Sequence, residues 1–223
     1  RLSNDVFTMD KILLGDVFIR GGSSSGTHVL EEGRPIGQFY GLVCNGIDEN
    51  GRYIMVDKDG DGEISDPADY DYIGSAQPKL TYGITNTFRY KNFDLSFFLR
   101  GTIGNDILNA TRMAYAQSGF LPGTNALDDP LTYTLSETPR FSNYYLEKGS
   151  FMRLDNLTLG YKIKALNGIR VYFTAQNLFV ITKYKGLDPE VPMDSGDGLT
   201  PGVEPREFYP KARTFSVGLN LNF

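Results

Sequence analysis

The segment DKDGDGEI carries the residues whose types and spacing best fit a chemical task. Asp57, Asp59 and Asp61 occupy alternate positions, and Gly62 follows them where a sharp turn would be needed. This spacing matches the first half of an EF-hand calcium loop, in which alternate side chains supply oxygen ligands and a later backbone carbonyl adds another. Glu63 stands where that carbonyl is expected. The segment therefore predicts a calcium site.

The expected calcium loop closes differently from that of an EF-hand. Calcium takes about 6 to 8 oxygen ligands, and the last position of an EF-hand loop supplies an acid that binds through both oxygens. Ala68 stands at that position, so we expect Asp66 or Asp69 to complete the shell. An acidic, solvated turn without metal is the alternative interpretation. No catalytic group accompanies the loop, so the ion would have a structural role.

Other residue types that do chemistry are sparse. The chain has one histidine, His28, and one cysteine, Cys44, and neither lies in a metal-ligating or nucleophilic pattern. The sequence contains no nucleophile elbow, phosphate-binding loop or zinc pattern. Its net charge of −5 argues against a nucleic-acid partner, which would require a basic surface. We therefore expect that the chain is not an enzyme.

Two pairs of neighbouring acids need a separate interpretation. Asp128 lies beside Asp129, and Asp188 lies two residues before Glu190, in segments that contain Pro and Gly. Paired carboxylates can serve as the acid and base of a glycosidase. Solvated loop charges are the simpler interpretation, and we adopt it for both pairs.

The C-terminal segment, residues 214–223, is the clearest structural element. It alternates strictly between apolar and polar residues, as a half-buried β-strand does. Its length matches the roughly 9 to 11 residues that a tilted strand needs to cross a bilayer. We expect this strand also to be the signal for barrel assembly, recognised by strand addition. Its apolar face consists of Phe215, Val217, Leu219, Leu221 and Phe223.

The same alternation recurs upstream, and no segment shows a sustained helical period, so we predict an all-β fold. The further strands are expected at 80–90, 93–100, 157–163 and 169–176, with a weaker one at 36–47. Aromatic residues near strand ends are typical of the interfacial girdles of membrane barrels. They are Tyr90, Phe93, Tyr161, Phe173 and Phe223.

The connections between these strands alternate in length. Residues 91–92 and 164–168 form short links, whereas segments 48–79, 105–150 and 182–213 are long. Outer-membrane barrels have short periplasmic turns and long outer loops, so we expect the long segments to be extracellular and the C-terminus periplasmic. Such barrels need at least about 8 strands, so we expect more of the barrel to precede Arg1.

Several segments, in this order, resemble one family. They are GRPIGQFYG (33–41), DKDGDGEI (57–64), YIGSAQPKLTYG (72–83), NFDLSFFLRG (92–101), GNDI (104–107), SFMRLDNLTLGY (150–161), VYFTAQNLF (171–179), TKYKGLDPEV (182–191) and YPKARTFSVGLNLNF (209–223). Together they identify residues 1–223 as similar to the C-terminal part of a SusC/RagA-type TonB-dependent outer-membrane transporter.

The resemblance implies an antiparallel transmembrane barrel of about 22 strands with a plugged lumen. It also implies a SusD-like surface lipoprotein as partner, TonB acting through an N-terminal region, and import of oligosaccharides or peptides. The plug and the TonB box are not expected within these residues. Two alternatives stay open: a segment of a passive porin, and a soluble, calcium-stabilised carbohydrate-binding β-sandwich.

Overall fold

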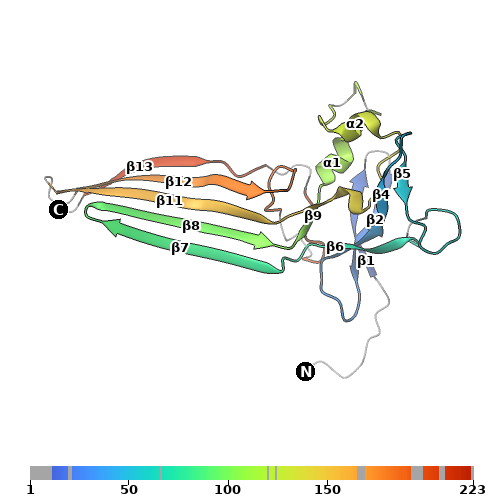
Figure 1. The fold of residues 1–223 in the computed structure, drawn as a ribbon, viewed down its shortest axis with the longest axis horizontal. Coiled ribbons are helices and arrows are strands. Elements are labelled where there is room, and N and C mark those ends of the chain that lie inside the picture. The colour runs from blue at the N-terminus through green and yellow to red at the C-terminus, as the bar shows by residue number, and fades with distance from the viewer. Residues whose placement is uncertain are drawn as a thin grey trace. The chain divides into compact units, whose positions relative to one another are not determined.

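The computed structural model describes residues 12–19, 22–65, 67–119, 121–123, 125–164, 169–191, 198–205 and 209–221 (Figure 1). The chain divides into two compact units. One, here called the sheet unit, comprises Pro78–Gly104, Gly149–Pro189 and Tyr209–Phe223. The other, the mixed unit, comprises Arg1–Gln77, Asn105–Lys148 and Glu190–Phe208.

The sheet unit is one antiparallel sheet of five strands in the order β13-β12-β11-β8-β7 (Figure 1). Each of the five strands that the sequence predicted with strict alternation is present, which confirms the all-β prediction for this unit. The four longer strands have 11 to 14 residues, enough to cross a bilayer at a tilt. The strands are β7 (Leu80–Tyr90), β8 (Phe93–Ile103), β11 (Phe151–Ile163), β12 (Ile169–Thr182) and β13 (Thr214–Asn220).

The strand registers align rows of like residues across the whole sheet. Successive side chains of a strand point to opposite faces, so neighbouring rows lie on opposite faces. One row is apolar on all five strands: Phe88, Leu95, Leu159, Phe173 and Val217. The next row carries a hydroxyl on all five strands: Thr87, Ser96, Thr158, Thr174 and Ser216. The sheet therefore has an apolar face and a polar face.

Strands β11 and β12 are longer than the sequence predicted. β11 begins at Phe151 instead of Leu157, and β12 continues to Thr182 instead of ending at Gln176. The cause is a bulge, because the register of β11 against both neighbours shifts between Leu154 and Asn156. An extra residue in one strand inverts the alternation beyond it. The pattern alone therefore identified only the regular half of each strand.

The mixed unit contains a four-stranded sheet in the order β1-β2-β3-β6 and two small two-stranded sheets. The four strands are β1 (Ile12–Ile19), β2 (Gly22–Leu30), β3 (Gln38–Leu42) and β6 (Tyr70–Ser75). The small sheets pair β4 (Cys44–Ile47) with β5 (Tyr53–Met55), and β9 (Asp106–Leu108) with β10 (Leu146–Lys148). The prediction of one barrel strand at 36–47 was wrong, because the chain breaks at Val43 into β3 and β4, which belong to different sheets outside the sheet unit.

In the described part of the mixed unit, three short helices interrupt the all-β pattern. They are α1 (Ala110–Tyr115), α2 (Pro130–Thr134) and the 3-10 helix η1 (Asn143–Tyr145). Asn109 caps α1 by accepting the backbone N–H of Arg112, and Asp129 caps α2 by accepting that of Leu131. Helices this short span too few turns to show a period in sequence. No helix in the described part of the chain is long and apolar enough to span a membrane.

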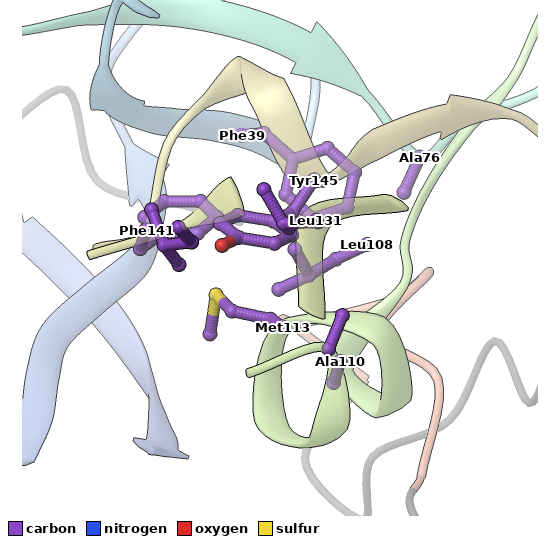
Figure 2. Close-up of a cluster of buried hydrophobic side chains, with 10 residues drawn as sticks. Phe39, Ala76, Leu108, Ala110, Met113, Leu131, Phe141 and Tyr145 are labelled. Carbon is purple, nitrogen blue, oxygen red and sulfur yellow. The ribbon is translucent and has the colours of Figure 1, made fainter. Parts of the chain in front are cut away.

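The core of the mixed unit is built largely from the predicted long loops. Leu108, Met113, Leu131 and Phe141, all within the predicted loop 105–150, are buried against Phe39 of β3 (Figure 2). The segment from 198 to 205 joins the same unit, where the backbone N–H of Leu108 bonds the carbonyl of Gly202 at 2.9 Å. The long segments are therefore packed parts of a folded unit and not open loops.

Candidate functional site

The acidic loop connects β5 to β6 and brings the three predicted aspartates together. Carboxylate oxygens of Asp57, Asp59 and Asp61 all lie within 4.8 Å of one another. Asp57 accepts hydrogen bonds from the backbone N–H groups of Gly60 and Gly62 at 2.6 and 2.9 Å. These bonds curl the loop around its own carboxylates. The resulting cluster of hard oxygen atoms matches the ligand preference of calcium.

Asp69 closes the loop from its C-terminal side. It accepts the backbone N–H of Lys58 at 2.7 Å and that of Ser65 at 2.8 Å. The Ser65 bond, followed by the Lys58 bond, lowers the pKa of the Asp69 carboxyl. This contribution to stability is present above the ordinary aspartate pKa and is lost as the pH falls through the lowered one.

The remaining predicted ligands are placed differently. Glu63 is exposed, and its backbone N–H donates to Asp61 at 2.8 Å. Among the described residues, the cluster of mutually close carboxylates contains neither Glu63 nor Asp69. Asp66 lies outside the described residues.

The interpretation of the paired acids as solvated charges was wrong for Asp129 and Asp188. Asp129 accepts from the Arg112 guanidinium at 2.9 Å in addition to capping α2. Asp188 pairs with Arg153 at 2.5 Å, and both side chains are buried. The chain folds back to bring each arginine from another element, so neither carboxylate is free to act as a general acid or base.

His28 and Cys44 are both buried in the mixed unit. His28 Nε2 donates to the carbonyl of Pro201 at 2.9 Å, and its Nδ1 lies 2.8 Å from the Thr27 hydroxyl. The Cys44 thiol donates to the Gly46 carbonyl at 3.1 Å, and burial raises its pKa. The imidazole therefore joins two chain segments, and the thiol is held in its unreactive protonated form.

The predicted assembly strand presents its apolar residues on the exposed face of β13 and just beyond it. Val217 is 77% exposed, although it lies level with the apolar residues of every other strand in the sheet. A soluble fold would cover such a row, whereas a membrane wall leaves it open to lipid. Phe223 lies outside the described residues. The exposed apolar residues of this segment are Phe215, Val217, Leu219 and Leu221.

The predicted aromatic residues gather at one end of the sheet. Tyr90, Phe93 and Tyr161 align in one row beside the β7–β8 turn, and the rings of Phe93 and Tyr161 are 4.6 Å apart. Phe173 lies in the next row of the apolar face, closer to the middle of the sheet. The row occupies the strand ends, where a barrel carries its interfacial aromatics.

The polar face also carries a pair of arginines that no sequence pattern predicted. Arg100 of β8 lies directly opposite Arg153 of β11, an arrangement in which like charges repel. Each has its own acid: Arg100 bonds Asp155 at 3.1 Å, and Arg153 bonds Asp188. Asp155 is the bulge residue, so the break in alternation was the only local signal of this arrangement.

Curated relatives align along most of the chain. TonB-dependent receptor P3 of Formosa agariphila is 34% identical over 237 residues, covering 88% of this chain and 23% of the relative. TonB-dependent receptor SusC of Bacteroides thetaiotaomicron is 36% identical over 228 residues, covering 94% of this chain and 21% of the relative. The chain belongs to the SusC/RagA-type TonB-dependent receptors. It spans less than a quarter of the length of these two relatives. No protein-family model matches the sequence.

Solved structures of this receptor family share the fold. The RagAB peptide transporter superposes with a TM-score of 0.71 at 25% identity, covering 96% of this chain and 25% of that chain. The RagAB peptide importer in the "closed-closed" state gives 0.70 at the same identity and coverage. The five-stranded sheet is accordingly part of a large transmembrane antiparallel β-barrel of the outer membrane. We expect the apolar face of the sheet to be the outer, lipid-facing surface and the polar face to line the lumen.

Proposed function

We propose that this chain is part of a TonB-dependent transporter that imports oligomeric nutrients, glycans or peptides, together with a SusD-like surface lipoprotein. The observation that carries the proposal is a bilayer-length wall with one mainly apolar and one mainly polar face, in a chain of the SusC/RagA type. A RagAB structure with the same fold is called a peptide importer. A passive porin segment is the second candidate, because a wall of this kind also lines porins.

Sidedness is part of the same proposal. Within the sheet unit, β7 joins β8 through residues 91–92, and β11 joins β12 through residues 164–168, at one end of the sheet. At the other end, every strand continues into a segment that belongs to the mixed unit or leads to it. We place the short turns and the C-terminus in the periplasm and the long segments outside the cell.

The test uses the complete transporter in a strain that lacks its chromosomal copy. Uptake of labelled oligosaccharides and peptides is measured with and without TonB, and the lipoprotein is sought by co-purification. We expect uptake that requires both TonB and the lipoprotein. Single cysteines at Lys91 and Tyr133, labelled on intact cells with an impermeant maleimide, provide the control for sidedness; only the Tyr133 position should react.

If the complete protein transports small solutes without TonB, the passive porin is the correct interpretation and this proposal is wrong. Removing residues 105–150 would not test the proposal, because Leu108, Met113, Leu131 and Phe141 of this segment supply the core of the mixed unit. Labelling at Lys91 but not at Tyr133 would reverse the sidedness.

We also propose that the acidic loop binds calcium as a structural ion. Asp57, Asp59 and Asp61 would supply side-chain oxygens and Glu63 its backbone carbonyl, with Asp66 or Asp69 closing the shell. The convergence of the three aspartates supports this, because their mutual repulsion is relieved by a divalent cation. We expect a dissociation constant between about 10⁻⁵ and 10⁻³ M, as in sensor and extracellular calcium sites.

Calcium titration calorimetry on the complete protein should show this binding, and the Asp57→Asn, Asp59→Asn double variant should lose it. Glu63→Gln is the matched control, because a backbone ligand survives the change and affinity should stay the same. Calcium at a hundredfold excess over its dissociation constant should stabilise the folded loop by about 2.7 kcal/mol. Equal binding by the double variant and the control would rule the site out.

A further inference from the structure

The chain doubles back on the sheet directly after β12. We call residues 183–189 the infolded segment; they belong to the sheet unit. The hydroxyl of Thr182, the last residue of β12, accepts the backbone N–H of Tyr184 at 3.1 Å. The same hydroxyl donates to the carbonyl of Ser150 at 2.9 Å. These two bonds fix the start of the segment to the end of the sheet.

The strand register shows where the segment goes. Asp188 accepts from the guanidinium of Arg153 at 2.5 Å, and Arg153 lies directly opposite Val180 of β12. Asp188 follows the end of β12 in the sequence, yet it lies level with a residue inside that strand. Arg153 is also directly opposite Arg100 on the polar face. The infolded segment therefore returns over the polar face of the sheet.

Packing within the segment holds it in one shape. A Cβ at Gly186 would lie 2.3 Å from the ring of Tyr184, so the ring lies directly against the glycine backbone. Tyr184 is buried, and so are both partners of the ion pair between Arg153 and Asp188. Segments fixed on a rigid scaffold in this way commonly carry binding residues.

Burial alternates along the segment. Tyr184 and Asp188 are buried, whereas Lys185 and Leu187 between them are exposed. Such alternation is typical of an extended chain, whose successive side chains point to opposite sides. Because Asp188 points to the polar face of the sheet, Leu187 points away from it. Leu187 is 52% exposed, so this segment presents an apolar side chain above a mainly polar face.

We propose that the infolded segment narrows the lumen of the transporter and that Leu187 limits the width of the nutrients that pass it. This rests on the proposed function, because the polar face lines a lumen only in the transporter barrel. A segment of fixed shape on the wall gives the passage a defined width at that level. The width of a passage and the groups that line it determine which solutes a channel or transporter admits. Leu187 is therefore a specificity-determining residue.

Cysteine labelling of the complete, detergent-purified transporter tests the position of the segment. Leu187→Cys is treated with N-ethylmaleimide and, separately, with a maleimide that carries a long polyethylene glycol chain. We expect the small reagent to react and the polymer to be excluded by the surrounding wall. Tyr133→Cys is the control, because Tyr133 is 74% exposed and lies in a segment placed outside the cell, so both reagents should react. Reaction of Leu187→Cys with the polymer at the rate of the control, or with neither reagent, would overturn the inference.

Uptake by cells tests the limit on width. Leu187→Trp adds bulk to the passage, Leu187→Ala removes it, and Leu187→Met is the matched control because it nearly conserves volume. With labelled linear and branched oligosaccharides and peptides, we expect the tryptophan variant to lose uptake of the widest compounds first. The alanine variant should admit them at least as well as the methionine control. Equal uptake of every compound by all three variants would refute the role of Leu187 alone. Failure of the proposed function would instead appear as no TonB-dependent uptake by the unchanged protein.

Discussion

Asp188→Ala is expected to destabilise the sheet unit by about 3 to 5 kcal/mol, because it leaves the buried guanidinium of Arg153 without its carboxylate partner. The Arg153 and Asp188 side chains are only 3% and 5% exposed, and they are 2.5 Å apart. Asp188 lies in the segment that follows β12, so the pair also fixes this segment against β11. Far-ultraviolet circular dichroism follows the unfolding of the complete protein in lipid vesicles.

The neighbouring pair provides the matched control. Arg100 lies directly opposite Arg153, but its pair with Asp155 leaves the two side chains 25% and 32% exposed. A pair this open is worth about 0 to 1 kcal/mol, so Asp155→Ala should cost far less. Replacing both buried partners, Arg153→Met with Asp188→Leu, should restore most of the loss. Equal effects of the two alanine variants would show that the buried pair does not carry the stability assigned to it.

Ile84→Arg should cost about 2 to 4 kcal/mol, the penalty for a cation on the lipid face of a barrel near the bilayer midplane. Ile84 lies near the middle of β7, aligned with Leu99 on the apolar face, and is 52% exposed. Folding into lipid vesicles at increasing guanidinium concentration measures the loss. The same variant should also accumulate less in the outer membrane of cells, because assembly competes with degradation.

Thr85→Arg is the control for this prediction. Thr85 is the next residue of the same strand and is also exposed, but its side chain lies on the polar face. An arginine there enters the aqueous lumen, so its cost should be much smaller. If both variants lose the same stability, the assignment of lipid and lumen faces is wrong.

The sequence by itself determined the five strands of the sheet unit and which residues share a face. Alternation with a period of two is a local property, so Phe215, Val217 and Leu219 reveal their common face without knowledge of any neighbour. The acidic loop was equally local: Asp57, Asp59 and Asp61 converge because a tight turn at glycine returns the chain on itself. The family resemblance, carried by short segments in order, was confirmed by the curated relatives.

Only the tertiary structure decided what depends on pairing between distant residues. The long segments show no hydrophobic periodicity in the sequence. Their short helices and strands are stabilised by burial against Phe39 and not by a local sequence pattern. Asp188 looked like a loop charge until folding placed Arg153 beside it, 35 positions away in sequence. Arg170 reaches Asp94 across 76 positions, and only at Gly160, where a side chain would block the path. The register between strands determines these contacts, and the register cannot be read from a residue's immediate neighbours in the sequence.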